Sequence, residues 1–218
     1  METIEKMDEF FAARAEGYDE HMLNEVGGCR EAYEKMAELI PDNTENLLDL
    51  GCGTGLELAG IFKRFPDASV TGIDLSKAML EKLSEKYSDK NITLINADYF
   101  STDLRREYFD TVISFQTMHH FSHEMKIGLY KKILNSLKSG GVYIECDYMV
   151  ETQAEENHWY AENARIRKEM NIPENEFYHF DTPCTAPNQI KMFKAAGFVN
   201  TEKVFRMEST TIIIAKKD

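Results

Sequence analysis

The residues best placed to do chemistry lie where glycines alternate along the chain. In the segment Asp49-Leu-Gly51-Cys-Gly53-Thr-Gly55 the glycines directly follow a strand-like run at 46–50, which contains Asp49. Glycines allow a chain to turn sharply and let a ligand approach its backbone. Dinucleotide-binding turns space their glycines G-x-G-x-x-G, whereas this turn reads G-x-G-x-G and begins at the carboxylate of Asp49. A negative group there disfavours a pyrophosphate and favours a ligand that carries an ammonium group.

Two further acids follow the next strand-like runs. Asp74 closes the run at 69–74, where a carboxylate can accept hydrogen bonds from both hydroxyls of a ribose. Asp98 follows the run at 92–95 and stands beside Tyr99, so the acid could accept a hydrogen bond from an adenine amine while the ring covers the base. Because the carboxyl ends of parallel strands meet at one edge of a sheet, the order of these acids predicts a site for an adenosyl ligand.

The elements that must position these side chains alternate along the chain. Short apolar runs separated by helical patterns are typical of a mostly parallel sheet with helices on both faces. A helix is expected at about 122–138, ending at Gly140-Gly141, and another at about 153–170. Strands are expected at 46–50, 69–74, 92–95, 111–115 and 141–147, followed by an antiparallel pair near 199–207 and 210–216.

Taken together, the motifs resemble those of one enzyme family, the class I S-adenosylmethionine-dependent methyltransferases. The matching segments are Leu47-Leu-Asp-Leu-Gly-Cys-Gly-Thr-Gly55, Gly72-Ile-Asp-Leu-Ser76, Asn96-Ala-Asp98, Phe109-Asp-Thr-Val-Ile-Ser-Phe115 and Leu137-Lys-Ser-Gly-Gly141, with Phe193-Lys-Ala-Ala-Gly-Phe198 near the end. The resemblance implies an α/β, Rossmann-like sheet of seven strands in the order 3-2-1-4-5-7-6, with strand 7 antiparallel. It also implies S-adenosyl-L-methionine as the cofactor.

On this resemblance the chain is one domain in four parts. We expect an N-terminal helical lid at 1–45, with a helix at about 3–15 and another at 29–39, and a cofactor-binding core at 46–150. An insertion over the acceptor site is expected at 151–185, and a final helix with the antiparallel strand pair at 186–218.

The resemblance also implies a role for individual residues. Asp49 would face the methionine ammonium, Asp74 would take the ribose hydroxyls, Asp98 would bind the adenine amine, and Gln116 would lie beside the sulfonium. The other cofactor contacts that it implies are Gly51, Gly53 and Gly55 at the turn, Leu75, Met79, Ala97 and Tyr99 around adenine, and Arg14 and Tyr18 of the lid near the methionine carboxylate.

Histidines and acids near the ends of the fourth and fifth strands are candidate catalytic residues. A general base is needed only if the acceptor must lose a proton, and the candidates are His119, His120, Asp147 and Glu145. An alternative is that one of the two adjacent histidines packs inward. We expect no metal at His119, His120 and His123, because no paired carboxylates or cysteine stand near them in the sequence.

The insertion is rich in aromatic and basic residues. Its rings predict a largely apolar pocket over a small organic acceptor, although Trp159 and Phe177 could instead seal the insertion onto the sheet. Arg165 and Arg167 are either helix C-terminal charges or anchors for an acidic substrate. The residues expected to contact the substrate are Tyr148, His158, Trp159 and Tyr178.

Three functions are compatible with these motifs. The first is methyl transfer to a small-molecule acceptor by in-line displacement at the sulfonium methyl. The second is modification of the cofactor itself, as in carboxy-S-adenosylmethionine synthases, with Arg165 or Arg167 binding an acidic co-substrate. The third is a non-catalytic, cofactor-binding regulator. A nicotinamide oxidoreductase is disfavoured by the glycine spacing.

Composition narrows the partners and the compartment. With 38 acidic and 25 basic residues the net charge is −13, so a nucleic-acid partner is not expected. No run approaches the roughly 18 apolar residues of a membrane helix, and the acidic N-terminus does not read as a targeting signal. Both a monomer and a homodimer fit the sequence. Widely separated cysteines without a CxxC pair favour a reducing cytoplasm; these are Cys29, Cys52, Cys146 and Cys184.

Overall fold

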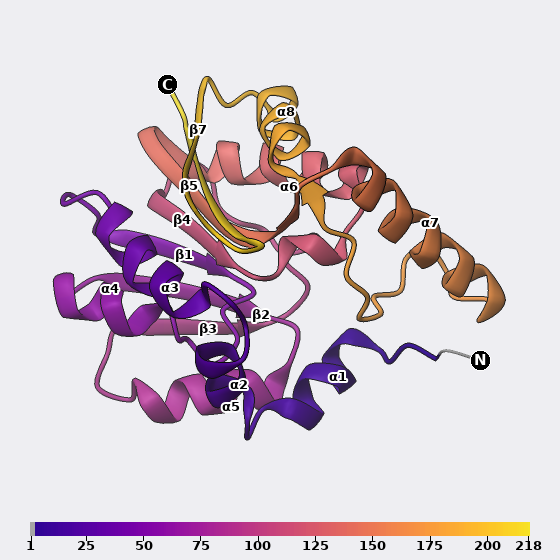
Figure 1. The fold of residues 1–218 in the computed structure, drawn as a ribbon. Helices are drawn as coiled ribbons and strands as arrows, with labels where there is room; N and C mark the ends of the chain where they lie inside the picture. Colours follow the sequence, from indigo (N-terminus) through magenta and orange to yellow (C-terminus); the bar gives the residue numbers. More distant parts are fainter. Residues whose placement is uncertain (1–2) are drawn as a thin grey trace.

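A mostly parallel sheet forms the centre of the molecule (Figure 1), as seen in a computed structural model that describes residues 3–218. The strand order is β3-β2-β1-β4-β5-β8-β7, and β8 runs antiparallel to both of its neighbours. This path confirms the expected order and the single reversal. The strands on it are β1 (Asn46–Leu50), β2 (Ser69–Asp74), β3 (Ile92–Asn96), β4 (Phe109–Phe115), β5 (Leu137–Val150), β7 (Asn200–Met207) and β8 (Thr210–Lys216).

The expected count of seven strands is wrong by one within the described residues. A two-residue strand, β6 (Cys184–Thr185), pairs in parallel with Met149 and Val150 at the end of β5. Its shortness explains why no strand pattern marks it in the sequence. The pairing matters because it ties the end of the insertion to the sheet edge where β5 ends.

Helices cover both faces of the sheet, as the alternation predicts. Helices α6 and α8 pack on one face, and α3, α4 and α5 on the other. Apolar residues on both faces keep the central strands dry; Leu47, Leu48 and Leu50 of β1 are fully buried. The helices are α1 (Met7–Arg14), α2 (Tyr18–Asn24), α3 (Cys29–Leu39), α4 (Leu58–Arg64), α5 (Lys77–Lys86), α6 (His123–Ser136), α7 (Gln153–Glu169) and α8 (Ala186–Ala196), with a 3₁₀ turn at Met118–His120. None of the helices in this part of the chain is long and apolar enough to span a lipid bilayer.

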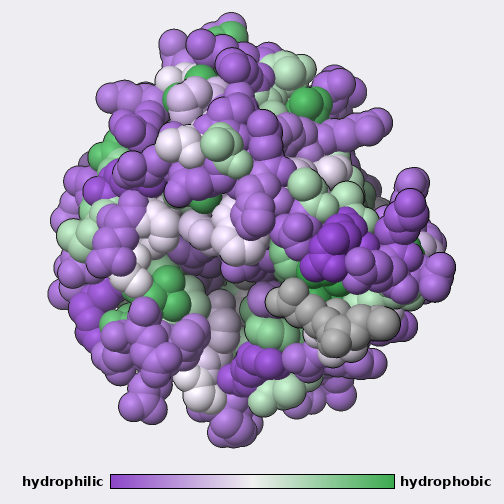
Figure 2. All heavy atoms as spheres, turned by 45° about the vertical axis from the view of Figure 1, so that its right-hand side comes forward, coloured by the Kyte–Doolittle hydropathy of each residue, from purple (hydrophilic) through white to green (hydrophobic). Residues whose placement is uncertain are grey.

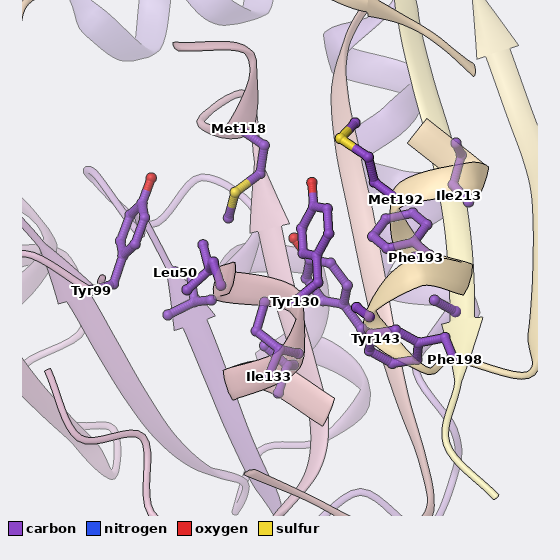
Figure 3. Packing of buried hydrophobic residues seen from close by; sticks show 14 of the residues in the cluster. Leu50, Tyr99, Met118, Tyr130, Ile133, Tyr143, Met192, Phe193, Phe198 and Ile213 are labelled. Carbon is purple, nitrogen blue, oxygen red and sulfur yellow. The ribbon is translucent and has the colours of Figure 1, made fainter. Parts of the chain in front are cut away.

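Aromatic side chains fill the layer between α6, α8 and the sheet (Figure 3). The rings of Tyr130 and Phe193 lie 4.6 Å apart, and Tyr143 is within 6 Å of both. The hydroxyls of Tyr130 and Tyr143 both donate to Oε2 of Glu145, at 2.8 and 2.9 Å. Glu145 is therefore part of the buried core, although the sequence made it a candidate base.

Two element boundaries differ from expectation. The expected helix at 3–15 is present as the shorter α1, and an additional short helix, α2, follows the turn at Gly17. Helix α6 ends at Ser136, before the glycine pair, and the extended Leu137 already begins β5. By contrast, the insertion helix α7 spans nearly the expected residues and starts with a capping box between Thr152 and Glu155.

The lid and the insertion are joined to each other. The chain after α7 returns beside α1 (Figure 1). The amide of Met7 donates to the carbonyl of Phe177 at 3.1 Å, and the amide of His179 donates to the carbonyl of Glu5 at 2.9 Å. The ring of Phe10 stacks on that of His179 with centroids 3.5 Å apart. These contacts place α1 and residues 176–181 over the carboxyl ends of the strands.

One lysine organises the loop that follows β3. The ammonium of Lys132, on α6, donates to the backbone carbonyls of Tyr99, Phe100 and Thr102. This loop carries Asp98 and Tyr99, so Lys132 helps to fix two residues expected to surround adenine.

Replacing Lys132 with methionine should therefore destabilise the protein. Lys132→Met keeps the apolar stem but removes the donor of three carbonyl groups, and we expect the free energy of unfolding to fall by about 1–3 kcal/mol. Urea denaturation followed by circular dichroism measures the change. The exposed neighbour gives the control Lys131→Met, which should change stability by less than about 0.5 kcal/mol. Equal effects of the two substitutions would contradict this role of Lys132.

Candidate active site

The glycine turn and the turn after β2 are joined by the carboxylate of Asp74. Its Oδ2 accepts a hydrogen bond from the amide of Gly53 at 2.8 Å, and its Oδ1 accepts one from the amide of Ser76 at 2.7 Å. Gly53 has a φ of +46°, which favours glycine. Burial raises the pKa of Asp74 to about 6, although both hydrogen bonds favour the ionised form.

A narrow cleft of about 50 Å³ opens beside this turn, under α1. Most of the residues expected to bind the cofactor line it, which agrees with their placement at strand ends. They are Tyr18, Gly51, Gly53, Asp74, Leu75, Met79, Ala97, Asp98, Tyr99 and Gln116. The cleft is also lined by residues that sequence reasoning missed, chiefly Met7, Asp8 and Phe11 of the lid. No local motif marks those three, because they reach the cleft only through the contact between lid and insertion. Phe177, which the sequence offered for the acceptor pocket or as a seal of the insertion, packs against the core and lines the cleft.

Three expected cofactor residues do not line the cleft. Gly55 packs against α5, where an added Cβ would lie 2.9 Å from Cγ of Leu83. Arg14 lines a different cavity and is engaged by Glu5, at 3.0 Å, and by the face of the Phe10 ring. Direct contact of these two residues with a bound molecule in the cleft is therefore not supported.

Asp49 is the third of these residues and lies beneath the turn. It is fully buried, and no N–H or O–H group among residues 3–218 donates to either of its carboxylate oxygens. Burial and the adjacent carboxyl group of Glu57 raise the pKa of Asp49 well above its usual range. A cationic group bound near the turn would favour the ionised forms of Asp49 and Glu57. An ammonium partner for Asp49 stays a prediction, and without direct contact its effect on Asp49 would be electrostatic.

A larger cavity of about 790 Å³ adjoins the cleft. Figure 2 shows a face of the molecule hollowed near its centre, surrounded by mostly hydrophilic surface. Three residues, Phe11, Tyr18 and Gln116, line both the cleft and the larger cavity. The amide nitrogen of the Gln116 side chain donates to Oγ1 of Thr210 at 3.3 Å, so its position is held by β8. A molecule in the cleft could therefore present one end to a second molecule in the larger cavity.

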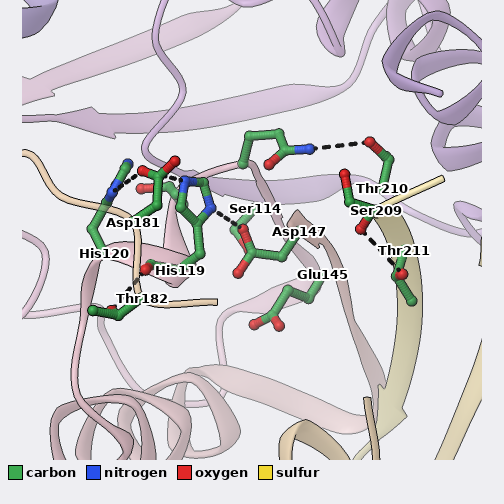
Figure 4. A network of polar contacts seen from close by, with 12 residues as sticks. Ser114, His119, His120, Glu145, Asp147, Asp181, Thr182, Ser209, Thr210 and Thr211 are labelled. Atoms are coloured by element: carbon green, nitrogen blue, oxygen red, sulfur yellow. Dashed lines mark hydrogen bonds and ion pairs between the residues drawn. The ribbon is translucent and has the colours of Figure 1, made fainter. Parts of the chain in front are cut away.

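Histidines and an aspartate form one wall of the larger cavity (Figure 4). Nδ1 of His119 lies 2.7 Å from Oδ1 of the buried Asp147, and its Nε2 lies 3.4 Å from Oδ1 of Asp181. Although burial opposes a charge on this ring, the two carboxylates raise the pKa of His119 to about 10. Burial lowers the pKa of His120, and the neighbouring charge of His119 lowers it further.

The structure brings His119, His120 and Asp147 together as expected, but it does not bring His123 to them. Nε2 of His123 lies 3.1 Å from Oε1 of the buried Glu156 instead. Asp181 is the member of this wall that sequence reasoning missed, because it comes from a loop without regular structure, whereas His179 is one of the insertion's rings that predict the pocket.

The expected contacts of the insertion need correction. Tyr148 lines the larger cavity, but His158, Trp159 and Tyr178 line neither it nor the cleft. Helix α7 leaves His158 exposed and places Trp159 near the ring of Phe180, while Tyr178, beyond that helix, pairs with Lys6 of the lid in an antiparallel β-bridge. Neither of the two arginines lines the cleft or the larger cavity. Arg165 pairs with Glu162 and Glu169 on the surface, and Arg167 donates to backbone carbonyls.

The sequence of this chain is similar to those of known methyltransferases. Residues 47–141 match the profile of a family described as "Methyltransferase domain". A malonyl-[acyl-carrier protein] O-methyltransferase of Acetivibrio thermocellus is 30% identical over 139 residues, which are 61% of this chain and 45% of that protein. Both findings agree with the resemblance of the sequence motifs to class I S-adenosylmethionine-dependent methyltransferases.

Other relatives extend over the whole chain. A carboxy-S-adenosyl-L-methionine synthase of Nautilia profundicola is 25% identical across 98% of this chain and 96% of its own length. By contrast, the chain spans only about half the length of the malonyl-[acyl-carrier protein] O-methyltransferases that it matches.

Solved methyltransferases share the fold. A putative O-methyltransferase from Nostoc punctiforme superimposes with a TM-score of 0.72 at 18% identity, over 97% of this chain and 61% of that one. Human N-acetylserotonin methyltransferase in complex with S-adenosylmethionine gives a TM-score of 0.65 at 15% identity, over 95% of this chain and 55% of that one. The family's cofactor is S-adenosyl-L-methionine, and the contacts of the individual cleft residues with it stay predictions.

The pKa of Asp74 predicts how affinity for the spent cofactor depends on pH. The ribose hydroxyls need an ionised carboxylate as acceptor, and a pKa of about 6 leaves Asp74 mostly protonated at low pH. We expect the dissociation constant of S-adenosylhomocysteine to rise about tenfold from pH 7 to pH 5. Calorimetric titration at several pH values measures it. Asp74→Asn should bind weakly throughout, with a flatter profile, and a wild-type affinity independent of pH would count against the assigned role.

Proposed function

We propose that this protein transfers the methyl group of S-adenosylmethionine to a small-molecule acceptor by in-line displacement. The observation that carries the proposal is the junction of the two cavities at Phe11, Tyr18 and Gln116. The narrow cleft has the glycine turn and acids suited to the adenosyl part. The larger cavity, at about 790 Å³, falls within the range of small-molecule sites.

Methyl transfer depends mainly on how the acceptor atom and the methyl group are aligned at that junction. The acceptor atom attacks the methyl carbon, the bond from carbon to sulfur breaks, and its electron pair stays on sulfur as a neutral thioether. Proximity and exclusion of water supply much of the acceleration in such a reaction. Gln116 and Tyr18 would hold the sulfonium end, and the apolar rings of the lid would keep water out.

The wall of the larger cavity that contains the histidines, called the histidine wall below, would contact the acceptor. His119 and His120 line the larger cavity beside Tyr148, so we assign them to contact with the acceptor. Asp147 is buried behind His119 and is a positioning residue, because it holds the ring through Nδ1 at 2.7 Å. The assays below determine whether the acceptor atom is oxygen, nitrogen, carbon or sulfur.

Modification of the cofactor is the second candidate, and one observation favours it. The match to carboxy-S-adenosyl-L-methionine synthases runs over nearly the full length of both proteins, whereas the methyltransferase matches are partial. Against it, Arg165 and Arg167, which the sequence offered as anchors for an acidic co-substrate, are engaged elsewhere. Mass spectrometry of the ligand that co-purifies with the protein separates the two, since a carboxylated cofactor is heavier than its parent.

Other partners follow from charge and composition. A net charge of −13 supports a small acceptor over a nucleic acid. A cytoplasmic location stays a prediction from the four free, buried cysteines.

A panel of acceptors tests the proposed activity directly. Purified protein with S-adenosylmethionine should release S-adenosylhomocysteine on addition of at least one small hydroxyl, phenol, carboxylate or amine compound. RNA, a protein mixture and malonyl-[acyl-carrier protein] serve as comparison substrates. Robust transfer to RNA or protein with none to small molecules would refute the proposal.

Substitution at the histidine wall tests the assignment of residues. We expect His119→Asn to lower kcat by about 10²-fold or more while the affinity for S-adenosylhomocysteine stays within about twofold, because the ring faces the acceptor cavity. Asp147→Asn should lower kcat less and leave KM for the cofactor unchanged. His158→Asn is the matched control on the exposed side of α7 and should keep full activity. Loss of cofactor affinity in His119→Asn would show a structural role instead.

A further inference from the structure

Three imidazole rings meet around one carboxylate oxygen in the wall of the larger cavity. Oδ1 of Asp181 lies 3.4 Å from Nε2 of His119 and 3.4 Å from Nδ1 of His120. Nε2 of His179 is 3.8 Å from the same oxygen. Figure 4 shows Asp181 between His119 and His120. This oxygen is buried and accepts no hydrogen bond of good geometry from any group in residues 3–218.

The spacing of these atoms is that of ligands around one metal ion. Zinc binds imidazole nitrogen and carboxylate oxygen at about 2.0–2.2 Å, so two ligands at neighbouring corners of a tetrahedron lie about 3.3–3.5 Å apart. The two distances of 3.4 Å to Oδ1 of Asp181 agree with that separation. The donor atoms of His119, His120 and Asp181 all lie within 4.8 Å of one another, which leaves one ion able to reach all three.

Asp147 supplies the support that metal-bound histidines usually have. Ligating imidazoles commonly donate their second N–H to a carboxylate, which fixes the tautomer and the ring orientation. Asp147 is 99% buried and lies 2.7 Å from Nδ1 of His119, so Nε2 is the nitrogen that faces Asp181, and a metal ion bound there would displace its proton. With neutral rings, the carboxylates of Asp147 and Asp181 would neutralise a divalent charge.

We propose that His119, His120 and Asp181 bind one divalent transition-metal ion, with His179 in reach as a further ligand. Imidazole with a carboxylate suits zinc, iron(II), cobalt or nickel better than magnesium or calcium, which prefer oxygen alone. All four residues line the larger cavity, so an open coordination position would face the acceptor.

The role of the ion rests on the proposed function. An acceptor with an ionisable oxygen would bind the ion through that oxygen and release its proton to solvent. The oxygen would then form its bond to the methyl carbon while the bond from carbon to sulfur breaks, with the electron pair left on sulfur. This narrows the acceptor to hydroxyl, phenol or carboxylate compounds.

This inference departs from the expectation of no metal. That expectation considered His123, which pairs with Glu156, and rested on the lack of carboxylates near the histidines in the sequence. Asp181 supplies the carboxylate from the far end of the insertion.

Metal titration of the intact protein tests the site without any acceptor. Chelator-treated protein is titrated with Co²⁺, followed by visible absorption, and with Zn²⁺, followed by equilibrium dialysis and elemental analysis. We expect one ion per chain. His120→Ala and Asp181→Asn should each weaken binding at least tenfold, and Asp147→Asn by 10- to 100-fold. His158→Ala should not change it, and circular dichroism checks that each variant is folded.

The outcomes separate this inference from the proposed function. Absence of stoichiometric binding, or equal binding by His120→Ala and Asp181→Asn, would overturn the metal site and leave the cluster as an ion pair of His119 with its two carboxylates. Titration with S-adenosylhomocysteine runs in parallel. If that ligand binds and the metal does not, only the metal site fails; if the metal binds and that ligand does not, the proposed function fails while the site stands.

Discussion

The structure of the site depends on a buried carboxylate that is shared between two turns. Asp74 accepts hydrogen bonds from the amides of Gly53 and Ser76, and so holds the loop after β1 against the loop after β2. Keeping a charge there is costly, which is why burial raises the pKa of Asp74 to about 6. The cost is tolerable because two amides already solvate the carboxylate, and a ribose would add its hydroxyl donors. One side chain thus holds together the two turns that line the cleft.

The site also needs a cover over the carboxyl ends of the strands. Two distant parts of the chain, the lid and the insertion, form this roof together. Residues 5–10 of the lid contact residues 177–179 of the insertion through backbone hydrogen bonds and through the stacked rings of Phe10 and His179. The lid is also held to the core, where Asp19 bonds to Thr54 beside the glycine turn and to Lys86 of α5. The same roof covers the cleft, where Met7, Asp8 and Phe11 of the lid and Phe177 of the insertion are part of the lining.

The sequence predicts the sheet and the cleft well because both depend on local patterns. Apolar runs, glycine turns and acids at strand ends stand close together in the chain, and Asp74, Asp98 and Gln116 line the cleft as expected. The acceptor side is predicted only in part. His119, His120 and Tyr148 line the larger cavity as expected, whereas Phe11 and Asp181 reach it only through the long-range contact between lid and insertion.

The many aromatic residues of the insertion show why composition alone does not identify the residues that line a cavity. Trp159 and His158 stand in a ring-rich stretch, but the direction of α7 turns them away from the cavity, and a helical pattern does not reveal that direction. Asp49 shows another limit. A motif places it beside the ligand, while the structure buries it outside the lining of the cleft, with a second acid, Glu57, next to it.

A crystal structure of the complex with S-adenosylhomocysteine tests the central claim most directly. The account predicts the ribose on the carboxylate of Asp74 and the thioether sulfur beside Gln116 and Tyr18, facing the larger cavity and the histidine wall. A ligand bound elsewhere, or one whose sulfur points away from that cavity, would contradict it.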